Sequence, residues 1–393
     1  MKHIKKITVI ALSLFTLAAC QKAINPITPD DAATAAKAAS NNDGDEFARN
    51  GGGKHVYTLS NQVSGNAVLD YTRASDGKLT YNTSYATGGT GTGGGLGNQY
   101  AVILGEDDDD ENVLLAVNAG SNSISSFNVT GNGLVLKSTV SSGGMRPVSI
   151  TQHDDIVFVL NAGGMGNISG FKLGNNNMLM PIANSTRPLS SSASGAAQVS
   201  FVNDGKVVVV TEKATNLIIT YTVNENGIPG MMHSITSANA TPFGFEAGKN
   251  GNIFVSEAAG GAAGASTLSS YRVSNDGTIN LVDGPNGAGQ SAACWVVITN
   301  NGKYAYTTNT ASNNLSTFDI NKNTGSVAVN TAISATTGMG PIDAALSNNS
   351  KYLYILNARS NSIGVYEVAN NGSLSFVQTM MGVPVGATGL AAR

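Results

Sequence analysis

The sequence predicts an all-β protein, a seven-bladed β-propeller built from four-stranded antiparallel blades. The first reason is that one short phrase of alternating apolar and polar residues recurs along the whole chain, as half-buried strands do. The seven copies are NAVLDYTR (66–73), NSISSFNV (122–129), NISGFKL (167–173), NLIITYTV (216–223), STLSSYRV (266–273), NNLSTFDI (313–320) and NSIGVYEV (361–368). The second reason is that Gly- and Asn-rich turns follow the copies, as in SDGKL (75–79), and supply the positive φ of tight hairpins.

Two further strands precede the phrase in most repeats. The nearer one is apolar and ends in a polar residue, and these ends are Asn118, Asn161, Glu212, Glu257, Asn309 and Asn357. The farther one is a short apolar segment such as RPVSI (146–150) or CWVVI (294–298). Each repeat therefore holds four short strands at a period of roughly 43–57 residues, close to the spacing of propeller blades.

The two ends of the repeat region predict how the ring closes. The first repeat begins near His55 with its second strand and lacks a first strand. The segment GATGLAAR (386–393) follows a complete last repeat and resembles the missing first strand. We therefore expect the C-terminal strand to pair with the N-terminal blade, which leaves no open edge, and we assign residues 54–393 to the propeller.

The N-terminus is predicted to be a lipoprotein signal peptide over residues 1–19. MKHIKK is basic, ITVIALSLFTLAA is a short apolar run, and LAAC (17–20) resembles the bacterial lipobox. Cys20 would be lipidated, and residues 20–53 would form a flexible tether to the membrane. A plain secretory signal is the alternative interpretation. The expected location is the bacterial cell envelope, on the periplasmic or cell-surface side, with the lipid as the only membrane attachment.

Composition and motifs exclude several classes of function. The formal net charge is −3 and no basic stripe is present, so nucleic acid is not expected as a partner. No HExxH motif or Cys/His cluster occurs, so no metal site and no cofactor are expected. The acidic run EDDDDE (106–111) lacks the spacing of a calcium loop and is predicted to be a solvated turn. We expect a monomer.

Two other stretches have structural interpretations. Cys294 lies in the apolar stretch SAACWVVI and is expected to be a small buried core residue. The Gly-rich run GGTGTGGGLGN (88–98) lacks the Lys-Ser/Thr pair and the helix of a phosphate-binding loop. It is predicted to be a flexible connection between blades.

Two runs carry a resemblance to a known family. NGKYAYTTNTASNNLSTFDI (301–320) and NSKYLYILNARSNSIGVYEV (349–368), together with the seven repeats, resemble the seven-bladed propeller lactonases. That family includes 6-phosphogluconolactonase and carboxymuconate-lactonizing enzymes, and the resemblance extends over residues 55–393. It implies that ligands meet the ring at the mouth of the central channel. The ligand-binding residues expected there are Asn118, Asn161, Glu212, Asn309, Asn357 and Asp343.

The resemblance also implies catalytic residues, and the sequence departs from the family pattern at two of them. The family Glu falls on Glu257, but the family His falls near Gly244, and a typical Asn-Arg pair is Asn309-Thr310 in this chain. Lactone hydrolysis needs a base for water and stabilisation of the oxyanion. If the activity is retained, Glu257 would be the base and Arg146 or Arg359 the stabiliser.

Each site residue also has a structural interpretation. The Asn residues could serve turn geometry, since Asn tolerates left-handed backbone. A structural role is favoured for Glu212, with Lys213 in a surface ion pair, and is weighed equally with a functional one for Glu257. Two hypotheses about function therefore stay open. One is binding of a lactone, sugar, metabolite or protein partner at the channel mouth, and the other is hydrolysis of a sugar lactone or related cyclic ester.

Overall fold

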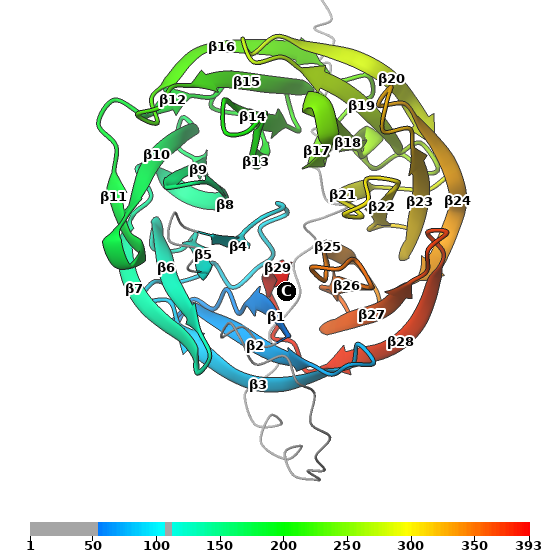
Figure 1. Ribbon diagram of the computed structural model, residues 1–393, viewed down its shortest axis with the longest axis horizontal. Coiled ribbons are helices and arrows are strands. Elements are labelled where there is room, and N and C mark those ends of the chain that lie inside the picture. The colour runs from blue at the N-terminus through cyan, green and yellow to red at the C-terminus, as the bar shows by residue number, and fades with distance from the viewer. Residues whose placement is uncertain (1–53, 107–111) are drawn as a thin grey trace, which may run out of the picture.

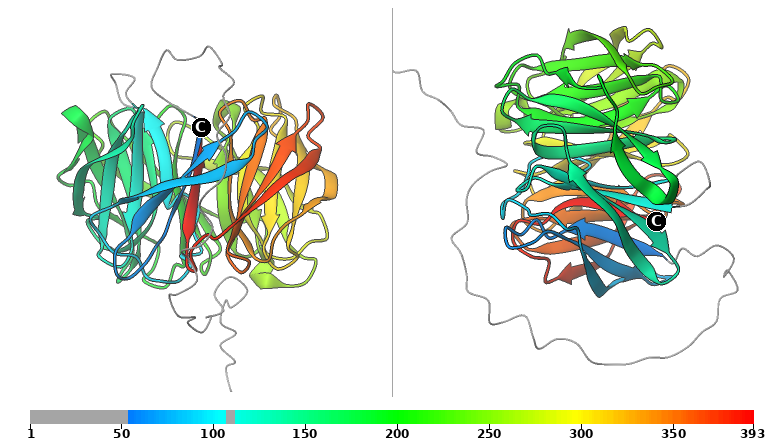
Figure 2. Two further views of the ribbon diagram at one scale, coloured as in Figure 1. Left: turned by 90° about the horizontal axis from the view of Figure 1, so that it is seen from below. Right: turned by 90° about the vertical axis from the view of Figure 1, so that its left-hand side faces the viewer.

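The computed structural model describes residues 54–106 and 112–393, which form a ring of seven β-sheets around a central axis (Figure 1). Viewed from the side, the sheets stand next to one another like the blades of a fan (Figure 2). The all-β seven-bladed prediction is confirmed. The only helical elements among the described residues are the 3₁₀ turns η1 (Asn175–Asn177), η2 (Lys249–Gly251) and η3 (Ala259–Gly261). The expected signal peptide and tether, and nearly all of the acidic run, lie outside the described residues.

The first four blades are antiparallel sheets, with their strands named from the axis outwards (Figure 1). They are β29 (Thr388–Ala392), β1 (His55–Leu59), β2 (Ala67–Arg73), β3 (Leu79–Ala86); β4 (Val102–Glu106), β5 (Asn112–Asn118), β6 (Ser123–Thr130), β7 (Gly133–Ser141); β8 (Met145–His153), β9 (Ile156–Gly163), β10 (Asn167–Gly174), β11 (Met178–Pro181); and β13 (Ala196–Val202), β14 (Val207–Glu212), β15 (Leu217–Val223), β16 (Pro229–Thr236). The third of these blades has an extra short strand, β12 (Arg187–Pro188), paired with β10.

The last three blades follow the same plan. They are β17 (Pro242–Ala247), β18 (Asn252–Glu257), β19 (Thr267–Val273), β20 (Ile279–Gly287); β21 (Ala293–Ile298), β22 (Tyr304–Asn309), β23 (Asn314–Ile320), β24 (Val327–Thr336); and β25 (Pro341–Leu346), β26 (Tyr352–Asn357), β27 (Ser362–Val368), β28 (Leu374–Met381). The outermost strands are mostly exposed, whereas the second and third strands are buried.

The ring closes between its first and last strands, as the sequence predicts. β29 pairs antiparallel with β1, with Tyr57 opposite Ala391. The Thr58 hydroxyl donates to the Gly389 carbonyl at 2.6 Å, and the Arg393 amide donates to the His55 carbonyl at 3.0 Å. The C-terminal segment therefore supplies the innermost strand of the N-terminal blade and covers the inner edge of β1.

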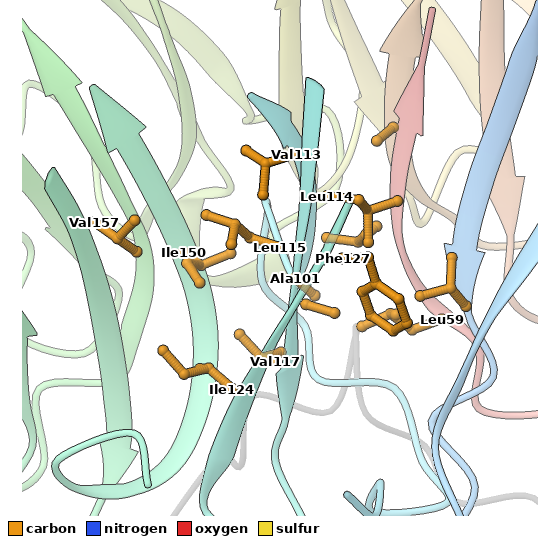
Figure 3. Close-up of a cluster of buried hydrophobic side chains, with 14 of the residues drawn as sticks. Leu59, Ala101, Val113, Leu114, Leu115, Val117, Ile124, Phe127, Ile150 and Val157 are labelled. Atoms are coloured by element: carbon orange, nitrogen blue, oxygen red, sulfur yellow. The ribbon is translucent and has the colours of Figure 1, made fainter. Parts of the chain in front are cut away.

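Apolar side chains fill the spaces between neighbouring blades. On β5, Leu114 lies beside Phe127 and Leu59, while Leu115 points the other way, toward Ile150 (Figure 3). Successive residues of a strand face opposite sides of the sheet, so one strand packs against both adjacent blades. Each buried Leu of this kind contributes about 1.5–3 kcal/mol relative to exposure. Cys294 is buried in another such layer, as expected.

Candidate functional site

A pocket of about 210 Å³ lies at the face where the innermost strands begin and the second strands end. We call it the mouth pocket. Its lining comes from four consecutive blades and from the connection between β3 and β4, and includes Asn98, Arg146, Lys213, Thr241, Phe243, Ala258 and Ala292. The pocket lies at the end of the ring where the resemblance leads us to expect ligands.

The mouth pocket has a cationic lining. Arg146 and Lys213 both line it, whereas no Asp, Glu or His does among the residues that the structure describes. The Lys213 ammonium donates to the Gly97 carbonyl at 2.8 Å and lies 4.5 Å from the centre of the Phe243 ring. Two cations beside an aromatic wall favour a small ligand that carries or develops negative charge.

Three residues in the lining have strained backbones. Arg146, Thr241 and Ala292 have φ of 54°, 63° and 55°, a region that non-glycine residues seldom adopt. The side-chain oxygen of Asn122 accepts the Arg146 amide at 2.7 Å, and that of Asn216 accepts the Thr241 amide at 2.7 Å. Such strain persists only where the surroundings enforce it, and it gathers at functional sites. The two hydrogen bonds from Asn122 and Asn216 hold the backbone of Arg146 and Thr241 in place at the pocket.

The connection between β3 and β4 contributes residues to the lining of this pocket. We call residues 96–101 the channel plug, and this part of the chain reaches toward the centre of the ring (Figure 1). Asn98 donates to the carbonyls of Ala196 and Ala197, both at 2.7 Å, and the Tyr100 hydroxyl donates to Glu246 at 2.5 Å. The prediction of a flexible connection is therefore wrong for this part of the run, because hydrogen bonds hold it to blades across the channel.

Gln99 also anchors the plug. Its amide donates to the Val296 carbonyl at 2.7 Å, and its side-chain oxygen accepts the Val296 amide at 3.2 Å. A Cβ atom on Gly244 would lie 2.2 Å from that side-chain oxygen and 2.6 Å from the Cys294 carbonyl oxygen. The position that the resemblance gives to the family His is thus a glycine whose side-chain space is taken by Gln99.

The hydrogen bonds between neighbouring innermost strands explain why the backbone of β21 needs a side-chain partner at the Gly244 position. The Ser149 hydroxyl accepts the Val199 amide at 3.1 Å, and Gln198 exchanges hydrogen bonds of 2.8 and 2.7 Å with the Phe245 backbone. In both cases an innermost strand satisfies the backbone of the next one. Gly244 cannot do this for β21, so Gln99 does it from the plug.

Glu257 lies at the predicted end of β18 but does not line the mouth pocket. It is buried, and its carboxylate accepts hydrogen bonds from the hydroxyls of Ser237, Thr267, Ser269 and Tyr271, at 2.5–2.9 Å. Its neighbour Ala258 does line the pocket. This geometry is that of a carboxylate that braces its own blade.

Glu212 has a similar environment. Its carboxylate is buried and accepts hydrogen bonds from the amide and hydroxyl of Ser190 and from the Thr215 hydroxyl. The Lys213 ammonium points to the plug, where it donates to the Gly97 carbonyl. Glu212 and Lys213 therefore do not form the expected surface ion pair. Glu212 hydrogen-bonds within its blade, and Lys213 lines the mouth pocket.

The four Asn residues also brace their blades. The side-chain amide of each one donates to a side chain on the third strand of the same blade. The pairs are Asn118 to Ser123 and Ser125, Asn161 to Asn167, Asn309 to Asn314 and Ser316, and Asn357 to Ser362. None of them has a positive φ, so turn geometry is not the reason for Asn at these positions. The repeated polar residue at the end of the second strand ties that strand to the third.

The three catalytic candidates are not gathered in the mouth pocket. Arg146 lines it, whereas Glu257 and Arg359 do not. Arg359 is exposed in the last blade, where its amide donates to the Met339 carbonyl at 3.0 Å. Asp343 is buried in β25, and burial raises the pKa of its carboxyl well above the ordinary value.

The sequence analysis did not predict Lys213 and Phe243 as pocket residues, and it did not predict the channel plug. The connection 87–101 was a usable signal, because it is much longer than connections such as 142–144 or 337–340 that join other blades. Long loops inside compact repeats are usually functional.

Among the described residues no three His, Cys, Asp or Glu side chains are placed to hold a metal, and no helix is long and apolar enough to span a membrane.

Comparison with known proteins finds a likeness to one kind of propeller over part of the chain. Residues 272–388 match the family model described as lactonase, seven-bladed β-propeller. Comparison with curated protein sequences gives no match.

Three solved structures illustrate the likeness in fold. A candidate 6-phosphogluconolactonase from Bacteroides uniformis has a TM-score of 0.66 at 18% identity, covering 86% of this chain and 99% of its own. A protein from Lactobacillus plantarum has a TM-score of 0.68 at 16% identity, with coverage of 86% and 99%. A periplasmic gluconolactonase from Pseudomonas aeruginosa has a TM-score of 0.66 at 14% identity, with coverage of 85% and 98%. The repeats and the ring confirm that this chain is a seven-bladed β-propeller, and its residues 272–388 are similar to the lactonases of that fold.

Proposed function

We propose that this protein hydrolyses a sugar lactone, with the mouth pocket as its substrate site. The observation that carries the proposal is the pairing of Arg146 and Lys213 in a pocket without an acidic lining residue among the described residues. The family-model match and the two relatives named as lactonases support the choice of a lactone over other anionic ligands.

The proposed reaction opens the ring ester with water. Water adds to the lactone carbonyl, the carbonyl oxygen becomes an oxyanion, and the ring oxygen then leaves with a proton as a hydroxyl group. Arg146 and Lys213 would stabilise the oxyanion and then the carboxylate of the sugar acid. Glu257 remains the proposed base, and it immediately precedes the pocket-lining Ala258 in the chain. To act, it would have to exchange one of its hydroxyl donors for water.

A second candidate function is recognition of the sugar acid without turnover. The observation that favours it is that no carboxylate or imidazole lines the mouth pocket in the part of the chain that the structure describes. A pocket of this kind can bind an anion but has no base in contact with it.

A lactone panel assayed with the full-length chain tests both candidates. We expect turnover of at least one aldonolactone above its spontaneous hydrolysis. Arg146→Gln and Lys213→Met should each raise KM about tenfold, because each removes one charge-assisted contact. The matched control is Lys78→Met, since Lys78 is exposed on a hairpin turn and paired with Asp76 at 2.7 Å. That variant should behave like the unmodified protein.

A binding measurement separates the two candidates. Trp295 is the only tryptophan of the chain, and its ring lies 4.9 Å from Phe243, which lines the mouth pocket. Gluconate that changes Trp295 emission, without turnover of any lactone, would favour recognition. Absence of both responses would contradict the mouth pocket as a sugar-acid site.

We also propose that the protein is attached to the cell envelope through a lipid on Cys20. The lipobox-like stretch LAAC (17–20) supports this, and a relative named as a periplasmic gluconolactonase is compatible with the location. Cys20→Ser should move the protein from the membrane fraction to the soluble fraction. Unchanged fractionation, or an intact mass without a lipid, would contradict the proposal.

A further inference from the structure

A second chamber of about 370 Å³ lies on the other side of the plug, where the innermost strands end. We call it the rear chamber. Its walls are mainly apolar side chains of the innermost strands, among them Val102, Leu104, Ile150, Val297, Leu346 and Leu390. Glu246 of β17 contributes a carboxyl group to the lining, and Tyr100 of the plug contributes a phenol. The mouth pocket and the rear chamber share no lining residue, so the two sites can be tested independently.

Glu246 has hydrogen bonds but no countercharge in this chamber. One carboxyl oxygen accepts the Tyr100 hydroxyl at 2.5 Å, and the other accepts the Ala247 amide at 3.2 Å. No Lys, Arg or His lines the chamber among the residues described. An ionised carboxylate in apolar surroundings is unfavourable unless a cation accompanies it.

Asp343 is a further carboxyl near Tyr100. Asp343 is 1% exposed, and one of its carboxyl oxygens has no hydrogen-bond partner among the described residues. Burial, and to a smaller extent the carboxyl groups of Glu246 and Asp343, raise the pKa of the Tyr100 phenol well above the ordinary value. Tyr100 therefore stays a neutral donor, and the only formal charges that the described lining of the chamber can develop are negative.

We propose that the rear chamber binds a small organic cation, a primary alkylammonium ion, with its ammonium group on Glu246 and its alkyl chain against the apolar walls. Such a ligand supplies the missing countercharge and covers the apolar lining at the same time. A bare metal ion fits less well, because no group of three His, Cys, Asp or Glu side chains is gathered among the described residues. The proposal concerns a site apart from the lactone pocket and does not rest on the proposed function.

The binding should be linked to protons. Burial raises the pKa of Glu246 to about 7, while the Tyr100 hydrogen bond opposes that rise. A cation binds the ionised carboxylate, so it lowers this pKa and releases a fraction of a proton at neutral pH. The ionised share of Glu246 grows about tenfold between pH 6 and pH 8, and the affinity should grow with it and then level off.

Calorimetric titration of the full-length chain with n-butylammonium tests the proposal. We expect one site, affinity about tenfold higher at pH 8 than at pH 6, and proton release at pH 7 when buffers of different ionisation enthalpy are compared. Glu246→Gln should weaken binding at least tenfold at pH 8, while its amide oxygen can still accept the Tyr100 hydroxyl. Lys78→Met, on an exposed hairpin turn, should leave the titration unchanged.

Several results would overturn the proposal. They are no binding of n-butylammonium at millimolar concentration, equal affinity for 1-butanol, and equal affinity in a folded Glu246→Gln protein. Loss of binding in a folded Lys78→Met protein would also overturn it, because the loss would then not be specific to Glu246. Thermal unfolding of each variant, recorded first, shows whether a loss of binding comes from a loss of fold.

Discussion

Replacing Gly244 with alanine is expected to lower the free energy of unfolding by about 2–4 kcal/mol, a large effect for one methyl group. The new Cβ would meet the Gln99 side-chain oxygen at 2.2 Å and the Cys294 carbonyl oxygen at 2.6 Å. The plug must move, and its two hydrogen bonds to Val296 are then lost. Urea denaturation of the full-length chain measures the change. Gly95→Ala is the matched control, since its Cβ would meet nothing within 4 Å, and it should stay within about 0.5 kcal/mol.

A double-mutant cycle shows whether Gln99 is the partner that matters. Gln99→Ala removes the nearest atom of the clash, so Gly244→Ala should be less damaging in its presence by at least about 1 kcal/mol. The rescue should be partial, because the Cys294 carbonyl oxygen remains close. Additive effects within about 0.5 kcal/mol would show that Gln99 does not fill the Gly244 space.

Replacing Glu257 with alanine is expected to lower the free energy of unfolding by about 3 kcal/mol or more. Its buried carboxylate accepts hydrogen bonds from four hydroxyl groups, which would be left without their acceptor around a cavity. Glu257→Gln keeps one acceptor oxygen and should lose less. Chemical denaturation with a parallel lactone assay separates a bracing role from a catalytic one.

The control for this second prediction is an exposed glutamate. Glu225 lies in the turn between β15 and β16, and Glu225→Ala should change the free energy of unfolding by less than about 0.5 kcal/mol. A Glu257→Gln protein of unchanged stability that has lost all turnover would assign Glu257 to catalysis. Equal loss of stability and turnover would assign it to the blade.

The fold was accessible from the sequence because each blade repeats the same local pattern. Alternation along β6 or β27, and a turn after each, is dictated by neighbours a few residues away, and closure follows from the spare strand at 386–393. The left-handed backbone of Arg146 and Thr241 was not predicted, because the hydrogen bonds that hold it come from Asn122 and Asn216 of the preceding blades.

The site was less accessible because it depends on contacts between distant segments. The end of a second strand was predicted to face the channel, but its side chains turn into the blade, where Asn309 meets Asn314 and Ser316. The residue that follows, such as Lys213 or Ala258, is the one that reaches the mouth pocket. Sequence spacing alone does not distinguish these two directions.

A crystal structure of the protein with gluconate bound tests the central claim most directly. We predict the ligand in the mouth pocket, with its carboxylate at hydrogen-bond distance from Arg146 or Lys213 and the channel plug unmoved beneath it. Gluconate bound elsewhere on the propeller, or an empty mouth pocket in crystals saturated with gluconate, would contradict the assignment.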